Sequence, residues 1–457
     1  MKKLIIVTIL LFGSFITAVA CLWDEDTIEM ERQQFPSAIE LISGKFLRHS
    51  PEFYAWRLKD RKEKLNKFPD SLALYDDLAV SYSKIGFQKK AIEVILKKDS
   101  IQSGQYKTYA NLGTFLLHDG QLKKGLVFIE KAIDINPLAH FGREVYQKLL
   151  AEYMLSKMDT GEISFPLDPT FPRNPYEYYG RLENSRNFYS FLLNKYKTNS
   201  GNLTESDNGK LPAEELEKAV TGIMGMMKFG DYTSPVLLET LGDLLLNTGD
   251  DDAARQLAAR AYLKASYQVN DYRAEKIYRK KVEYTIRHQL NKKSGGSFTI
   301  QALEELLKEE IKEGDQFYRT IRDDEISWIE SGKDPEQAFA EKYYDEPKVS
   351  ERVQHSDRKI GNAMDNYAND NSIGKIVDYR SEGGQEKIKS SKDKGENGAD
   401  SSARKLIKEL RGLEKPDANQ QKSFLNNNKN LFFGSLALLI VLAGGIYWYK
   451  QRRKIKG

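Results

Sequence analysis

A set of small, apolar and turn-forming residues recurs at a fixed interval, and this interval constrains the fold more than any other feature of the sequence. The first copy consists of Leu78, Ala79, Tyr82, Gly86 and Ala91, and the second of Leu112, Gly113, Leu116, Gly120, Gly125, Ala132 and Pro137. A third copy lies further along the chain, at Leu241, Gly242, Leu245, Gly249, Ala254 and Ala261. The step from Leu78 to Leu112 and from Gly86 to Gly120 is the same, and self-similarity at a fixed interval of this length is typical of stacked helical units. We therefore expect an all-α fold built from antiparallel helix pairs.

Each repeated position has a steric reason. The small residues Ala79, Gly113 and Gly242 are expected where two helices approach each other most closely. Gly86 and its equivalents fall at the turn inside each pair, where a left-handed backbone ends the first helix with little strain. Pro137 ends the second helix of its repeat, because proline cannot continue a helix.

The spacing and the residues resemble those of the tetratricopeptide repeat family over residues 72–105, 106–139 and 235–268. The resemblance implies an α-solenoid, a curved stack of helix pairs. The start of the chain is also similar to exported bacterial tetratricopeptide proteins of undefined role, at Cys21-Leu22-Trp23-Asp24, Gly44-Lys45-Phe46 and Glu52-Phe53-Tyr54.

In tetratricopeptide arrays the first helix of each pair lines a concave groove, so the resemblance implies a groove that binds a protein or peptide. The twelve positions that it transfers are Asp76, Val80, Ser83, Lys84, Ala110, Asn111, Thr114, Leu117, His118, Glu239, Asp243 and Asn247. Members that grip a chaperone's C-terminal carboxylate need Lys and Asn early in the first repeat, where this chain has Asp76 and Val80. Capture of acidic peptides is therefore not expected, and a solvated helix face is the alternative for the whole set.

The first twenty residues have the order of a secretory signal peptide. Lys2 and Lys3 precede the apolar run 4–16, and Ala18 and Ala20 supply the small residues before a cleavage point. Cys21 then stands where a bacterial lipoprotein carries its acylated cysteine, so lipidation at Cys21 and an unmodified cysteine both remain open.

A second membrane signal lies near the other end, where residues 431–449 contain no charge. As a helix this run rises about 28 Å, close to the thickness of the bilayer hydrocarbon. Trp448 with its flanking tyrosines suits an interfacial belt, and five cations between Lys450 and Lys456 favour a cytoplasmic end. We expect a single-pass membrane protein whose bulk is extracytoplasmic, either periplasmic or at the cell surface.

Four further segments have a recognisable character. Pro166, Pro169, Pro172 and Pro175 recur every third residue, which favours an extended segment packed across helices, with a docking strip for a partner as the alternative. Met224, Met226 and Met227 are expected to fill the core rather than form a binding surface. The stretch 272–290 is expected to cap the stack as a solvated helix, and 300–344 to be a helical group broken by its glycines, including Gly314 and Gly332.

The sequence offers no catalytic or cofactor-binding motif. Its single cysteine excludes a disulfide or a cysteine zinc site within the chain, and its five histidines show no His-Glu-x-x-His spacing. No Gly-Lys pair has the context of a phosphate-binding loop. The net charge of +4 depends on seven cations at the chain ends, and without them the balance is −3, which gives no reason to expect nucleic-acid binding. We expect no enzyme activity, no cofactor and no metal.

These patterns divide the chain into nine regions. They are a signal peptide (1–20), an N-terminal helical segment or degenerate repeat (21–71), two repeats (72–139), a helical insertion with the proline segment (140–234), a repeat with a capping helix (235–290), a helical segment (291–346), a disordered linker (347–430), a transmembrane helix (431–449) and a basic cytoplasmic tail (450–457). The expected function is that of a membrane-tethered scaffold for protein–protein interaction in the bacterial cell envelope. A surface protein that binds glycans or nutrients is the alternative.

Overall fold

The regular secondary structure of the described residues is helical. The computed structural model describes residues 24, 30, 33, 35–137, 139–159, 161–170, 186–200, 209–248, 252–286 and 299–344. The chain divides into two units, 1–390 and 391–457, and every described residue belongs to the first. Within the described ranges no strand forms, and the one β-type pairing there is an isolated bridge between Asp159 and Glu162. The prediction of an all-α chain is confirmed.

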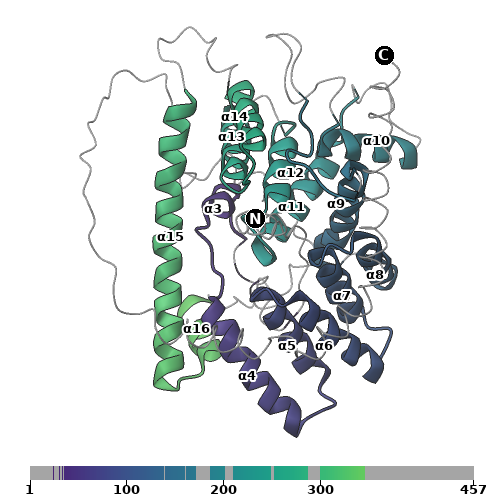
Figure 1. The fold of residues 1–457 in the computed structure, drawn as a ribbon, viewed down its shortest axis with the longest axis vertical. Helices are drawn as coiled ribbons and strands as arrows, with labels where there is room; N and C mark the ends of the chain where they lie inside the picture. The colour runs from purple at the N-terminus through teal and green to yellow at the C-terminus, as the bar shows by residue number, and fades with distance from the viewer. Residues whose placement is uncertain are drawn as a thin grey trace, which may run out of the picture. The chain divides into compact units, whose positions relative to one another are not determined.

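The helices follow one another along the chain, with short connections from α4 to α9 and a longer one between α9 and α10 (Figure 1). Those before and within the first two repeats are α3 (Ala38–Ser43), α4 (Pro51–Lys67), α5 (Leu72–Lys84), α6 (Gln88–Ile101), α7 (Tyr106–His118) and α8 (Leu122–Ile135). The central group consists of the 3-10 turn η1 (Ala139–Gly142), α9 (Arg143–Lys157), α10 (Phe188–Ser200) and α11 (Ala213–Phe229). The last group consists of α12 (Pro235–Leu245), α13 (Asp252–Ser266), α14 (Tyr272–Ile286), α15 (Ile300–Ser331) and α16 (Pro335–Tyr343).

The repeat interval of the sequence is visible in the helix boundaries. The distance in sequence from Gly86 to Gly120 is the repeat step. Helix α7 begins and ends one such step after α5, and α8 begins and ends one step after α6. Each pair packs together, and a turn of three residues makes its two helices antiparallel. Gly86 and Gly120 lie in these turns with φ of 90° and 77°, as their place in the repeat predicts. Helices α12 and α13 also pack together, while Gly249 lies outside the described residues.

Small residues allow the helices of each pair to approach closely. A Cβ added at Gly113 would lie 2.6 Å from Cδ1 of Ile129 on α8, and one added at Gly242 would lie 2.7 Å from Cε1 of Tyr262 on α13. No side chain fits at either place, so the steric role predicted for these glycines is confirmed. Met224, Met226 and Met227 on α11 are also buried, which confirms their prediction as core residues.

Helix α15 connects the two ends of the helical array. Near its C-terminal end Arg322 donates to Glu52 of α4 at 2.6 Å. Near its N-terminal end Glu310 accepts from Arg260 of α13 at 2.9 Å, and Glu304 accepts from Arg279 of α14 at 2.7 Å. Figure 1 shows α15 running from α13 and α14 to α4 and α16. This single helix therefore links the first helices of the array to the last.

Gly314 does not break α15, contrary to the prediction. The helix runs unbroken through this residue and ends only at Gly332, whose φ is 74°. Gly314 instead lies against the backbone of the turn after α3, where a Cβ would collide with the carbonyl oxygen of Ser43 and lie 3.1 Å from the carbonyl carbon of Gly44. Glycine is required here by the close passage of another chain segment and not by a helix end.

The stretch 272–290, which is expected to cap the stack as a solvated helix, is amphipathic in its described part. Helix α14 covers residues 272–286, and Tyr278, Lys281 and Val282 on it are fully buried. The basic character that suggested solvation belongs in part to Lys281, whose charge is used inside the fold. Residues 287–290 lie outside the described ranges.

Both expected membrane segments lie outside the described residues. These are the signal peptide with Cys21 and the transmembrane run 431–449, together with the linker 347–430 and the basic tail. Among the helices that the structure does describe, none combines the length and the apolar composition needed to cross a bilayer.

Replacing Gly314 with Ala tests the close passage of α15. In an open helix this change stabilises by up to about 1 kcal/mol, because glycine is the poorer helix former. Here the added methyl group meets main chain, so we expect a loss of about 2 kcal/mol in the free energy of unfolding. Chemical denaturation measures the difference, with Gln316→Ala at an exposed position of the same helix as the control. Stabilisation by Gly314→Ala would show that α15 does not lie against the turn at Ser43.

Glu304 makes the docking of α15 dependent on pH. The Arg279 guanidinium, aided by the Tyr267 hydroxyl and opposed by partial burial, lowers the pKa of Glu304 from 4.5 to about 2. In the unfolded chain Glu304 takes up its proton near the ordinary pKa, so its stabilising contribution is complete above that value and is lost as the pH falls toward 2.

We expect this loss to be about 1 kcal/mol between roughly pH 5 and pH 2 and to be absent in Glu304→Gln. Urea denaturation across the interval measures it, and Glu305→Gln is the exposed control next to it. If the free energy of unfolding depends on pH in the same way in the native chain and in Glu304→Gln, the contact between Glu304 and Arg279 is contradicted.

Candidate partner-binding groove

The groove positions on α5 and α7 are buried among polar partners. Asp76 is 4% exposed and accepts from Lys98 Nζ of α6 at 2.6 Å and from Asn111 Nδ2 of α7 at 3.2 Å. Burial raises the pKa of Asp76 to about 6, against the opposing effect of Lys98. Thr114 on α7 accepts from Gln147 Nε2 of α9 at 3.0 Å. The first helices of consecutive repeats are thus joined by hydrogen bonds on their inner side.

The remaining positions on these two helices are also covered. Ser83 is buried and donates to Gln88, while the half-buried Lys84 donates to the backbone oxygen of Phe229 at the end of α11, at 2.7 Å. The other four positions are buried as well: Val80, Ala110, Leu117 and His118.

Glu239 on α12 is fully buried and holds a bend of the chain at residues 167–168. Its two carboxylate oxygens accept from the backbone N–H of Leu167 at 2.8 Å and of Asp168 at 3.1 Å. They also accept from the Tyr278 hydroxyl at 2.7 Å and from Lys281 Nζ at 3.0 Å. Burial, followed by the charge of Glu239, raises the pKa of Tyr278 well above its usual value, so its hydroxyl remains a donor. Four donors compensate for the removal of this carboxylate from water.

Asp243 lies one turn further along α12 and holds the start of α10. It accepts from the backbone N–H of Phe188 at 3.2 Å and from the Tyr262 hydroxyl of α13 at 2.8 Å, and Lys281 Nζ lies 3.9 Å away. Burial raises the pKa of Asp243 to about 7, partly offset by Lys281. Asn247, at the end of this row, is half-buried and donates to the backbone oxygen of Asp243 at 2.9 Å.

The structure therefore brings the predicted residues together in two sets, one on α5 and α7 and one on α12, but does not leave them as an open groove. Ten of the twelve are buried, and Lys84 and Asn247 are half-buried. On α12 the covering segment is the start of the proline segment, where Leu167 and Asp168 are buried. The predicted packing across helices is seen at residues 166–168, but residues 165–167 form a bend and are not extended, and 171–175 lie outside the described ranges.

Sequence reasoning missed the residues that complete this site. The backbone N–H groups of Leu167, Asp168 and Phe188 carry no side-chain signal, although the three-residue proline period did mark an extended segment. Tyr278 and Lys281 lie three residues apart on one face of α14, a spacing equally common on solvated helices. Their partner Glu239 lies on α12, two helices earlier in the chain.

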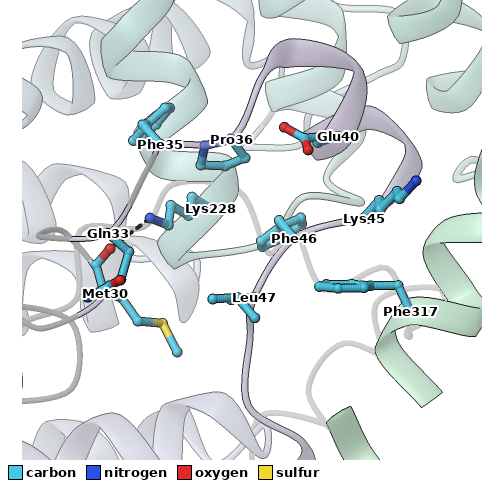
Figure 2. A pocket seen from close by; sticks show the side chains of 10 residues that line it. All are labelled: Met30, Gln33, Phe35, Pro36, Glu40, Lys45, Phe46, Leu47, Lys228 and Phe317. Carbon is cyan, nitrogen blue, oxygen red and sulfur yellow. Dashed lines mark hydrogen bonds between the residues drawn. The ribbon is translucent and has the colours of Figure 1, made fainter. Parts of the chain in front are cut away.

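A cavity of about 190 Å³ lies apart from these positions, between the N-terminal segment, α11 and α15 (Figure 2). Its walls are mixed, with the apolar side chains of Phe46, Leu47 and Phe317 facing polar ones such as Gln33 and Glu40. The buried Lys228 reaches its edge and donates to the backbone oxygen of Met30 at 2.9 Å. No group of three or more metal-ligating side chains occurs among the described residues, either here or elsewhere.

Comparison with models of known protein families and with curated protein sequences gives no match. The tetratricopeptide resemblance thus depends on the repeat residues and on the helix boundaries alone.

Changing Glu239 to Gln tests whether its negative charge stabilises the contacts of α12 with residues 167–168 and with α14. The change leaves the buried Lys281 without its nearest carboxylate, so we expect the free energy of unfolding to fall by about 3 kcal/mol. Glu283→Gln, at an exposed position of α14, is the control and should change stability by less than about 0.5 kcal/mol.

A double-mutant cycle with Lys281→Met separates the pair from other effects. The double variant should be more stable than the sum of the single losses predicts, with a coupling of about 1–3 kcal/mol. Additive losses would show that Glu239 and Lys281 do not interact.

Proposed function

We propose that the chain is a membrane-tethered extracytoplasmic scaffold of the tetratricopeptide type, which binds a protein or peptide partner through its helical repeats. The observation that carries the proposal is that the inner side of α12 already binds main-chain N–H groups of segments distant in the sequence. Glu239 accepts two consecutive backbone N–H groups, and Asp243 accepts a third.

Main-chain recognition of this kind suits a peptide ligand. Backbone N–H groups are present in every peptide, so carboxylates on a helix supply affinity where the peptide bends, while neighbouring side chains supply specificity. The equivalent boundaries of α5 and α7, and of α6 and α8, support the assignment of a repeat array, in which contacts are spread over several units. A partner would add its own segment along this row, next to residues 167–168 or in their place.

The proposed location depends on the sequence. A signal peptide at 1–20 and an apolar run at 431–449 would place the helical array outside the cytoplasm and attach it to the membrane. As a flexible coil the linker 347–430 would span about 50 Å, which gives the array freedom to search for a partner.

The alternative of glycan binding has less support. Sugar sites generally use exposed aromatic rings, whereas Tyr262 and Tyr278, the tyrosines beside Glu239 and Asp243, are fully buried and donate to these acids. The buried acids on α12 are each held by several donors, which suits a binding and structural role rather than acid–base catalysis.

The proposal is tested in cells with the full chain carrying a photo-crosslinking amino acid at Asn247, the half-buried end of the α12 row. We expect a discrete protein adduct that is absent when the same group is placed at the exposed Glu283 of α14. If Asn247 gives no protein adduct while the purified chain binds a soluble glycan, glycan binding becomes the favoured function and the protein scaffold the alternative.

A topology measurement accompanies this test. A reporter that is active only outside the cytoplasm, fused after Asn430, should be active, and a cytosolic reporter at the same position should not. If only the cytosolic reporter is active, the proposed extracytoplasmic location is wrong.

A further inference from the structure

The second helices of the array share an outward face on which apolar side chains are exposed. Helices α4, α6 and α8 end at Lys67, Ile101 and Ile135, so their ends follow one another at the repeat interval. At or just after each of these ends stands a large apolar residue: Phe68 is 63% exposed, Ile101 40% and Ile135 48%. Leu96 on α6 and Val127 on α8 add to this row. We call these five residues the outer ridge.

Lysines surround the outer ridge at the same interval. On α6 the exposed Lys89, Lys90 and Lys97 occupy the repeat positions that Lys123, Lys124 and Lys131 occupy on α8. Together α4, α6 and α8 expose ten lysines against four acidic residues. This face is therefore strongly basic, although the chain as a whole carries only +4.

The acidic residues on these helices cancel only part of the charge. Glu93 pairs with Lys90 at 2.9 Å and Asp60 with Lys64 at 2.8 Å, while Glu130 pairs with Lys148 of α9 at 3.0 Å. Two ridge lysines are also held in equivalent places by aromatic rings: Lys97 Nζ lies 5.5 Å from the ring of Tyr75, and Lys131 Nζ lies 5.4 Å from that of Tyr109. The rings position these ammonium groups next to the apolar ends of α6 and α8.

We propose that the outer ridge and its lysines dock onto the surface of an anionic lipid bilayer. Lysines attract anionic headgroups, and exposed aliphatic and aromatic side chains between them can enter the boundary with the acyl chains. A nucleic acid fits less well, because Phe68, Leu96, Ile101, Val127 and Ile135 offer hydrophobic area and no hydrogen bonds to phosphate or base edges.

The tether strengthens this docking and connects it to the proposed function, on which the inference rests. In the proposed function a membrane span at 431–449 would tether the array through the linker 347–430, whose average end-to-end distance as a flexible coil is about 50 Å. Docking then becomes an intramolecular event at high effective concentration, so modest attraction suffices. The outer ridge would then contact lipid, and the α12 row would remain available to a protein partner.

The test uses the full chain reconstituted in lipid nanodiscs and a fluorescent label at a single cysteine, in a Cys21→Ser background. The label is placed at Gln102, which is exposed next to Ile101, or for comparison at Gln316, which is exposed on α15. A quencher attached to the lipid headgroups reports how close each position comes to the bilayer.

With anionic lipid we expect quenching at Gln102 to exceed that at Gln316 by about threefold, and the excess to fade in neutral lipid and at high salt. Replacing Lys89, Lys90, Lys123 and Lys124 with Gln should remove the excess. The matched control replaces four exposed lysines of α14 and α15, Lys276, Lys280, Lys308 and Lys312, and should retain it. Ile101→Ser with Ile135→Ser should also reduce it, at unchanged charge.

Two outcomes in nanodiscs contradict the docking. Equal quenching at Gln102 and Gln316 in anionic nanodiscs overturns it, and so does displacement of the ridge from the lipid by duplex DNA at equal phosphate concentration. Failure of the chain to insert removes the tether but not the docking, which is then decided by sedimentation of the same full chain with anionic vesicles. Absence from the vesicle pellet in that case overturns the docking as well.

Discussion

The fully buried carboxylate of Glu239 is the interaction on which the rest of the arrangement depends. A charge removed from water must be met by several donors, and no single helix can supply them. Glu239 therefore requires the main chain of residues 167–168 and the side chains of Tyr278 and Lys281 at one place. Asp243 extends the requirement to the start of α10 and to Tyr262 of α13. One row of acids on α12 thus fixes four other segments.

The same physical rule operates where α15 and α16 meet the first helices. The buried Glu325 of α15 pairs with His49 and accepts from the backbone of Ser50, and the buried Arg57 of α4 lies 2.9 Å from Glu336 of α16. Arg57 also lies 2.7 Å from Asp24 and 3.0 Å from Asp77, so several segments must meet at this buried guanidinium. A repeat array normally contacts only its sequence neighbours, but here α15 joins the first helices to α13 and α14.

Local features were predictable from the sequence, and long-range ones were not. The turns at Gly86 and Gly120 and the tight contacts at Gly113 and Gly242 follow from residues whose sterics act within one helix pair. Gly314 looked like a helix breaker because its partner, the backbone at Ser43, is far away in sequence. The groove positions on α12 were correctly placed side by side, but their burial depends on Leu167, Phe188 and Lys281, whose approach no local pattern reveals.

A helical array whose inner acids hold main chain from distant segments, and whose outer side is basic and apolar, suits a protein that acts by contact. Hydrogen exchange of the Leu167 and Asp168 amides in the full chain tests this account most directly, since both amides donate to Glu239. The account predicts slow exchange at both positions in the native chain and rapid exchange in Glu239→Ala. Exchange at the rate of a free peptide in the native chain would contradict it.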